Sequence, residues 1–316
     1  MNVTNTGKIP EILVIGVGKA GNKIIDRFWT ASSTILTVAA DTDEQVLDST
    51  HADLKILLSK SQSKKPEEEN QAGFSTAVTE KWSDIDCLIG SETIVFILEG
   101  YGRSAGSGES YEVAKIAREK GALVIALVSL PCLIKDGGIH PLEDYLHHLI
   151  DSADSVIVLQ NNWILENFCH TFPTEVYAKM DGIILGVLEG LVTSLTLTCL
   201  EKCDREDFRA IFGNRGLAIV LYGESDLNVV NTNESVVRNC LKSPSLNIDY
   251  QGARGCFVLI AGGNDLNRFD TEEIATSLTY DLDRHAEIVW SSRIEKEMEG
   301  RVRVYAIITG IGEMKK

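Results

Sequence analysis

The residues most suited to chemistry form a glycine-rich stretch at positions 100–108, with the sequence GYGRSAGSG. It follows an apolar run at 93–98 and precedes a helical pattern at 109–120. Glycines let the backbone approach a ligand closely, and the free N–H groups of a helix N-terminus suit a phosphate. The stretch therefore indicates a nucleotide phosphate loop, and Arg103, Ser104 and Ala105 make it an altered one.

A second glycine turn, GVGKAG at 16–21, lies between an apolar run and a helical pattern. Asp41 stands 20 residues beyond Gly21, at the end of the next apolar run. This GxGxxG pattern with a later acid is the dinucleotide fingerprint, in which the acid faces the ribose. Taken alone, it indicates a nicotinamide or flavin enzyme, or a tight strand–helix turn that binds nothing.

The elements that must position these turns are apolar strands separated by helices. The strands are expected at 11–16, 35–40, 93–98, 122–128 and 155–159. Near-continuous apolar strands of this kind predict a parallel sheet that is covered on both faces, in a doubly wound α/β domain. Two glycine turns at the carboxyl edge of one sheet could hold a triphosphate from both sides. No GxxxxGK[ST] pattern occurs, so an ordinary P-loop is excluded.

A long apolar helix is predicted at 175–200, followed by a second, smaller α/β domain. Gly182, Gly186 and Gly190 lie on one face of that helix, which suggests close approach of another element. The predicted domains are an N-terminal nucleotide-binding domain at 1–174, the central helix at 175–200 and a C-terminal α/β domain at 201–316. Strands are expected at 216–222, 253–261, 285–291 and 301–309, helices at 233–241 and 271–282, and an exposed polar loop at 59–71.

Composition narrows the class of protein. The net charge of −16 argues against a broad nucleic-acid surface and against adhesion to anionic membranes. There is no signal-like N-terminus and no run of about 18 apolar residues, so we expect a cytoplasmic protein without a membrane-inserted helix. The seven cysteines are odd in number and lack CxxC spacing, which predicts buried thiols in a reducing compartment and no metal site.

Several segments, taken in order, resemble one known family. The segment GKAGNKI at 18–24 is similar to the first loop of tubulin and FtsZ, DTD at 41–43 to their second loop, and 102–108 to the signature GGGTG[ST]G. The segment 156–162 resembles the one that ends in PND, and 253–266 the one that ends in GGPDL. The chain is therefore identified as a divergent member of the tubulin/FtsZ superfamily of GTP-binding cytoskeletal proteins.

This resemblance implies a site for GTP or GDP, with Mg²⁺ bound mainly through the phosphates. Asp181 aligns near the asparagine that reads the guanine base in the family. A carboxylate accepts from guanine N1 and N2 but cannot donate to O6, so guanine is still favoured over adenine. The implied nucleotide-binding residues are Gly18, Lys19, Ala20, Gly21, Asn22, Asp41, Gly102, Arg103, Ser104, Ala105, Gly106, Ser107, Gly108, Asn161 and Asp181.

The resemblance also implies head-to-tail assembly, in which the next subunit completes the active site. That subunit is a second copy of this chain or another FtsZ-like protein. Asp204 and Asp207 match the two aspartates that position the attacking water in the family. The alternative is that these two residues only cap the helix near Phe208.

Because the sequence departs from the family pattern at several positions, it does not decide whether the protein hydrolyses GTP. Lys202 replaces an asparagine, Ala105 replaces the signature threonine, Trp163 replaces an arginine, and Lys135 and Ile139 fall near the glutamate and arginine of the family. Two interpretations follow: a filament-forming GTPase, or a scaffolding relative with weak or no hydrolysis. A dinucleotide-dependent oxidoreductase is a third, without an evident hydride-transfer constellation.

The third loop of the family is replaced by a polar stretch around 64–71. The sequence ends six residues after Gly310, where FtsZ proteins usually continue into a linker and a membrane-tethering tail. We therefore expect no membrane attachment through such a tail.

Overall fold

The computed structural model describes residues 9–29, 34–58, 86–101, 109–130, 140–160, 163–164, 173–196, 203–225, 232–242, 244–246 and 248–311. The chain divides into two compact units, Met1–Val156 and Ile157–Lys316. Each unit combines a β-sheet with helices, which confirms the predicted α/β class. The polar stretch at 59–71 lies outside the described residues.

The first unit contains a parallel sheet with the strand order β3-β2-β1-β4-β5. Almost every residue of the central strands is buried, as expected for a sheet that is covered on both faces. The short, partly exposed β3 was not predicted. The strands are β1 Ile12–Val17, β2 Ile35–Asp41, β3 Leu54–Leu57, β4 Ile94–Gly100 and β5 Leu123–Leu130.

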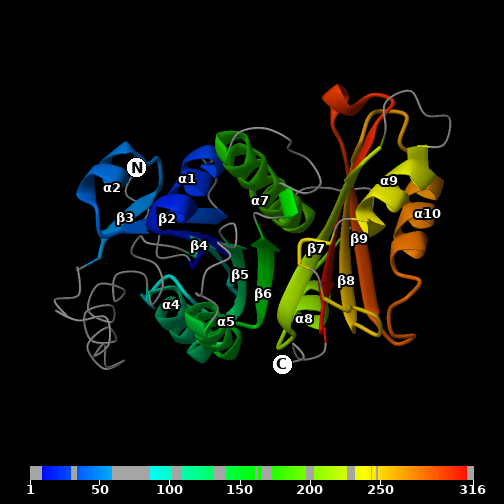
Figure 1. Ribbon diagram of the computed structural model, residues 1–316. Helices are drawn as coiled ribbons and strands as arrows, with labels where there is room; N and C mark the ends of the chain where they lie inside the picture. The colour runs from blue at the N-terminus through cyan, green and yellow to red at the C-terminus, as the bar shows by residue number, and fades with distance from the viewer. Residues whose placement is uncertain are drawn as a thin grey trace. The chain divides into compact units, whose positions relative to one another are not determined.

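The helices of this unit cover opposite faces of the sheet. Helices α1 (Gly18–Phe28) and α2 (Glu44–Ser49) lie on one face, and α4 (Glu109–Glu119) and α5 (His140–Ser152) lie on the other (Figure 1). From β1 the chain builds outward to β2 and β3, then returns to place β4 on the other side of β1. The strand order therefore reverses between β1 and β4, and open α/β sheets bind ligands at the carboxyl end of such a switch point.

Strand β6 (Ser155–Gln160) crosses the boundary between the units, and the second unit has a mixed sheet in the order β7-β10-β8-β9. Strand β10 is antiparallel to both neighbours, whereas β8 and β9 are parallel. Helices α9 and α10 cover one face, and α7 and α8 cover the other (Figure 1). The bounds are α7 Pro173–Thr196, α8 Arg205–Phe212, β7 Gly216–Glu224, α9 Thr232–Leu241, β8 Gly255–Gly262, α10 Arg268–Leu278, β9 Glu287–Ile294 and β10 Val302–Thr309.

Helix α10 begins three residues earlier and ends four residues earlier than the predicted 271–282. The reason is a capping box: the Asn267 side chain accepts from the backbone N–H groups of Phe269 and Asp270, and the Asp270 carboxylate accepts from the N–H of Asn267. This reciprocal pair satisfies the first donors of the helix and sets its start.

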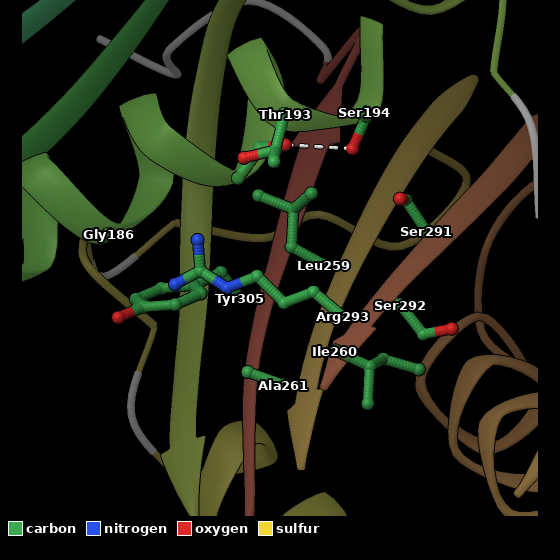
Figure 2. Close-up of a pocket in the computed structure, with 11 residues that line it drawn as sticks. Gly186, Thr193, Ser194, Leu259, Ile260, Ala261, Ser291, Ser292, Arg293 and Tyr305 are labelled. Atoms are coloured by element: carbon green, nitrogen blue, oxygen red, sulfur yellow. Dashed lines mark hydrogen bonds between the residues drawn. The ribbon is translucent and has the colours of Figure 1, made fainter. Parts of the chain in front are cut away.

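Two of the three glycines on α7 allow the helix to pack closely on the sheet. A Cβ at Gly190 would lie 2.6 Å from Leu259 Cδ1, and one at Gly186 would overlap the Tyr305 hydroxyl. Figure 2 shows both partners among the strands that face α7. A Cβ at Gly182 would meet none of the described atoms within 4 Å. The predicted close approach is therefore confirmed at Gly186 and Gly190, whereas none of the described residues approaches Gly182.

A charged network joins α7 to β7 and β10. The Glu224 carboxylate accepts from Arg303 Nε at 2.9 Å and from the Tyr222 hydroxyl, and it lies 3.8 Å from Lys179 Nζ. Lys179 Nζ also donates to the Tyr222 hydroxyl at 3.1 Å. Burial alone would raise the pKa of Glu224, but the Tyr222 hydrogen bond and the charges of Lys179 and Arg303 outweigh it and hold that pKa below its ordinary value.

The structure also tests two expectations that came from composition. The thiols of Cys203, Cys240 and Cys256 are buried, but Cys87 is exposed, so the expectation of burial is wrong there. Cys87 lies in a short turn before β4, outside the packed sheet. Within the part of the chain that the structure describes, no helix combines the length and apolarity needed to cross a membrane.

We predict opposite effects for alanine at two glycines of α7. Gly190→Ala forces Leu259 to repack and should lower the free energy of unfolding by about 1–3 kcal/mol. Gly182→Ala meets no neighbour among the described residues and gains helix propensity, so it should raise that free energy by up to about 1 kcal/mol. Urea unfolding of both variants checks this, and a loss of stability in Gly182→Ala equal to that in Gly190→Ala would contradict the packing described.

We predict that Glu224→Gln is less stable than the native chain at pH 7 by about 1 kcal/mol, because a third of the carboxylate side chain is exposed and solvent screens its ion pairs. The folded pKa lies below the ordinary 4.5, so the stabilisation is present above that pH and disappears as the pH falls through the folded value. Thermal unfolding at pH 7, 5 and 3.5 should show a difference in stability between the two proteins that shrinks as the pH falls. A stability difference that does not depend on pH would contradict the role given to the Glu224 charge.

Candidate functional site

The first glycine turn joins β1 directly to α1 at the switch point. Gly18 has φ 68°, which a glycine adopts without strain. A Cβ at Gly21 would overlap the carbonyl oxygen of Leu98 on β4, and one at Gly16 would lie 2.5 Å from Ile25 Cγ1. The start of α1 is therefore pressed against the ends of two adjacent strands, where only glycine fits.

The N-terminus of α1 has no side-chain cap. Its N-cap residue is Val17, whose side chain can accept no hydrogen bond, whereas α2, α8 and α10 are capped by Asp43, Asp204 and Asn267. The first-turn N–H groups of α1 thus lack the side-chain acceptor that those helices have. Free N–H groups at the positive end of a helix dipole favour an anion such as a phosphate.

The structure brings Asn22 and Asp41 together beside this turn. Asn22 is buried, and its Nδ2 donates to the Ala40 carbonyl at 3.0 Å and to Asp41 Oδ2 at 3.4 Å. Asp41 is also buried and accepts from the Asp43 N–H at 3.0 Å. The Oδ1 atom of Asn22 is buried without a hydrogen-bond partner among the described residues. A buried acceptor of this kind calls for a donor, which a ligand can supply.

The second glycine turn is described only at its start. A Cβ at Gly100 would lie 2.6 Å from that of Ala20, so the end of β4 touches the first turn of α1. The Tyr101 N–H donates to the Ser129 carbonyl at 2.9 Å. The candidate residues Gly102, Arg103, Ser104, Ala105, Gly106, Ser107, Gly108 and Asn161 lie outside the described residues, as do Lys135, Ile139 and Lys202.

A polar pair that sequence reasoning missed lies at the carboxyl end of β4. Glu99, the next-to-last residue of β4, is 3% exposed and accepts a hydrogen bond of 2.6 Å from the Tyr145 hydroxyl. The Tyr145 ring stands 4.9 Å from that of Tyr101. Burial, and then the charge of Glu99, raise the pKa of Tyr145. The available signal was an acidic residue at the end of an otherwise apolar strand; nothing in the sequence pointed to Tyr145.

The remaining candidates belong to the second unit. Asp181 is half-buried on α7. Asp204 and Asp207 form a capping box at the start of α8: Asp204 Oδ1 accepts from the Asp207 N–H at 3.0 Å, and Asp207 Oδ2 accepts from the Asp204 N–H at 2.9 Å. The structure therefore contains the capping role that was the alternative for Asp204 and Asp207. These two bonds use one oxygen of each carboxylate. The catalytic role stays a prediction.

A small pocket of the same unit lies between α7 and strands β8, β9 and β10 (Figure 2). Its polar lining includes Thr193, Ser292 and Arg293. Over the described ranges, no three His, Cys, Asp or Glu side chains converge as metal ligands would. What the described groups can do chemically is hold an anion at α1 and exchange hydrogen bonds with a ligand at Asn22 and Asp41.

A doubly wound sheet with an uncapped helix N-terminus at its switch point is the arrangement of nucleotide-binding α/β proteins. Comparison with known families agrees with this class. Residues 11–168 match the GTPase domain of the tubulin/FtsZ family, and residues 216–312 match the C-terminal domain of the FtsZ family.

Individual relatives cover nearly the whole chain. It is 35% identical over 304 residues to cell division protein FtsZ 2 of Haloferax volcanii, covering 96% of this chain and 76% of the relative. It is 36% identical over 305 residues to FtsZ 2 of Halobacterium salinarum, covering 96% and 77%. An empty FtsZ dimer structure from M. jannaschii superposes with a TM-score of 0.83 at 30% identity, covering 97% of this chain and 90% of that one.

The chain therefore belongs to the tubulin/FtsZ family, as the sequence resemblance indicated. This assignment replaces the oxidoreductase interpretation of the GxGxxG turn.

Proposed function

We propose that this protein binds guanine nucleotide at the carboxyl edge of the first sheet and assembles head to tail, with GTP hydrolysed at the contact between subunits. The observation that carries the proposal is the uncapped N-terminus of α1 at the β1–β4 switch point. The names of its relatives support a role in cell division.

In this proposal the α1 N–H groups hold phosphate oxygens, and Mg²⁺ binds mainly through the phosphates. Asn22 and Asp41 lie beside the turn, where the acid of the dinucleotide fingerprint meets the ribose. The free Oδ1 of Asn22 can accept from a hydroxyl or an amine of the nucleoside. Asp181 reads guanine by accepting from N1 and N2.

Hydrolysis needs a carboxylate from the next subunit to orient water for in-line attack on the γ-phosphoryl group. Asp207 is the better placed of the two candidates. Asp204 Oδ1 serves two backbone donors, the N–H groups of Glu206 and Asp207. Asp207 is fixed by one bond through Oδ2. The capping box would hold Asp207 rigidly at the start of α8, as a water-positioning group requires.

Self-association is supported by the family and by the similar FtsZ dimer. A site made from two different faces of neighbouring subunits is a heterologous contact, which repeats into open filaments. One observation favours the alternative, a scaffolding protein with weak or no turnover: both aspartates already serve as caps.

We predict that Asp207→Ala abolishes GTP turnover and leaves GTP affinity unchanged, because the residue acts on the nucleotide of a neighbouring subunit. The matched control is Asp270→Ala, which removes the equivalent capping residue from α10. Both variants should lose about 1 kcal/mol of stability. Calorimetry should show GTP bound more tightly than ATP, and phosphate release should be lost only in Asp207→Ala. Equal turnover in the two variants would discard the shared-site mechanism, and equal affinity for ATP would remove the guanine assignment.

A further inference from the structure

Lys19 is an exposed cation in the first turn of α1, the helix whose start has no side-chain cap. A positive charge is unfavourable there, because the N-terminus of a helix is the positive end of its dipole. The first turn of α1 contains no acidic residue. Helices α2, α7, α8, α9 and α10 do have acidic residues in the first turn, namely Glu44, Glu175, Glu206, Asp207, Glu234 and Asp270. The start of α1 therefore collects positive charge where those helices neutralise it.

None of the described residues balances the charge of Lys19. The lysine forms no ion pair within the described ranges, whereas Lys120 and Lys179 lie 2.7 and 3.8 Å from the carboxylates of Asp86 and Glu224. The side chains of an α-helix lean toward its N-terminus. An ammonium group on the second residue of α1 can therefore reach an anion that binds at the start of this helix.

About one turn further along α1, a second group also lacks the partner that it needs. Asn22 is 1% exposed, and its Nδ2 donates to the Ala40 carbonyl and to Asp41, but its Oδ1 has no hydrogen-bond partner among the described residues. A buried acceptor calls for a donor. A hydroxyl of a nucleoside would satisfy Asn22, and a phosphate would satisfy Lys19. One nucleotide supplies both groups.

The net charge of the chain makes a fixed cation at this position important. At −16, the chain as a whole repels a nucleotide. Hydrogen bonds between an ammonium group and phosphate oxygens are charge-assisted, and the attraction grows with each negative charge on the ligand. The nucleoside itself carries no charge and does not feel this attraction.

We propose that Lys19 is a specificity-determining residue that binds the phosphates directly, so that the site retains GDP and GTP without a divalent cation. The inference rests on the proposed function, because it assumes a guanine nucleotide at this edge of the first sheet. Its consequence is a site that prefers phosphorylated ligands over the nucleoside even when Mg²⁺ is withdrawn.

The experiment compares guanosine, GDP and GTP by calorimetry at low salt, once with EDTA and once with Mg²⁺. In EDTA, the native chain should bind GDP and GTP more tightly than guanosine. Lys19→Gln should leave guanosine affinity unchanged, weaken GDP by about threefold and weaken GTP by about tenfold, since the attraction scales with ligand charge. With Mg²⁺ the loss for GTP should fall to about threefold, because the cation neutralises part of the same phosphate charge.

The matched control is Arg27→Gln. Arg27 is an exposed cation in the last turn of the same helix, eight residues or about 12 Å along the axis from Lys19. The variant removes the same unit of charge, so an effect of net charge alone would appear in both proteins. We expect all three affinities of Arg27→Gln to match those of the native chain.

Thermal unfolding of the ligand-free proteins separates a binding role from a structural one. Lys19→Gln should be at least as stable as the native chain, because it removes a cation from the positive end of the helix dipole. Arg27→Gln should be slightly less stable, because it removes a cation from the negative end of the dipole.

The proposal is overturned if Lys19→Gln keeps the native ratio of GTP to guanosine affinity in EDTA, or if Arg27→Gln loses as much GTP affinity as Lys19→Gln. It is also overturned if the native chain binds guanosine but not GTP in EDTA, or if ligand-free Lys19→Gln is clearly less stable than the native chain. The failure of the proposed function is a separate result. If none of the three ligands binds to the native chain with or without Mg²⁺, the site is not a guanine nucleotide site, and this inference fails with it.

Discussion

The backbone contact between Gly21 on α1 and the carbonyl of Leu98 on β4 is the constraint on which the rest of the site depends. No side chain fits between them, so α1 begins directly against the strand on the far side of the switch point. This closeness places the free N–H groups of α1 beside the end of β4, where the second glycine turn starts. It also sets Asn22 against Asp41, and Glu99 within one strand spacing of the first turn. A larger residue at Gly21 would push the start of α1 away from β4 and so disturb all of these contacts at once.

The second unit follows the same physical rule with different partners. Gly186 and Gly190 remove side chains where α7 meets β8 and β10, and the network around Glu224 then joins the helix to the sheet. At the start of α8, the reciprocal bonds of Asp204 and Asp207 replace the free N–H groups that α1 keeps. The starts of α1 and α8 therefore differ: the first is left open for an anion, and the second is closed by two carboxylates.

Local patterns were enough to predict most of the fold. Near-continuous apolar runs separated by helical patterns predicted β1, β2, β4 and β5, because strands that are buried on both faces need such runs. The short β3 escaped prediction because its half-exposed residues show no such run. The Glu99–Tyr145 pair could not be predicted, because the two residues are 46 positions apart and only the packing of α5 brings them together. The capping box was foreseen as an alternative, since an acid three residues after another before a helix is a local signal.

The central claim is that subunits share one site, and phosphate release as a function of protein concentration tests it most directly. The protein is mixed with GTP and Mg²⁺, and phosphate and sedimentable polymer are measured in the same reaction. The account predicts turnover per subunit that is near zero in dilute solution and rises in parallel with polymer. Turnover per subunit that is constant over the concentration range, or polymer that forms without any phosphate release, would contradict it.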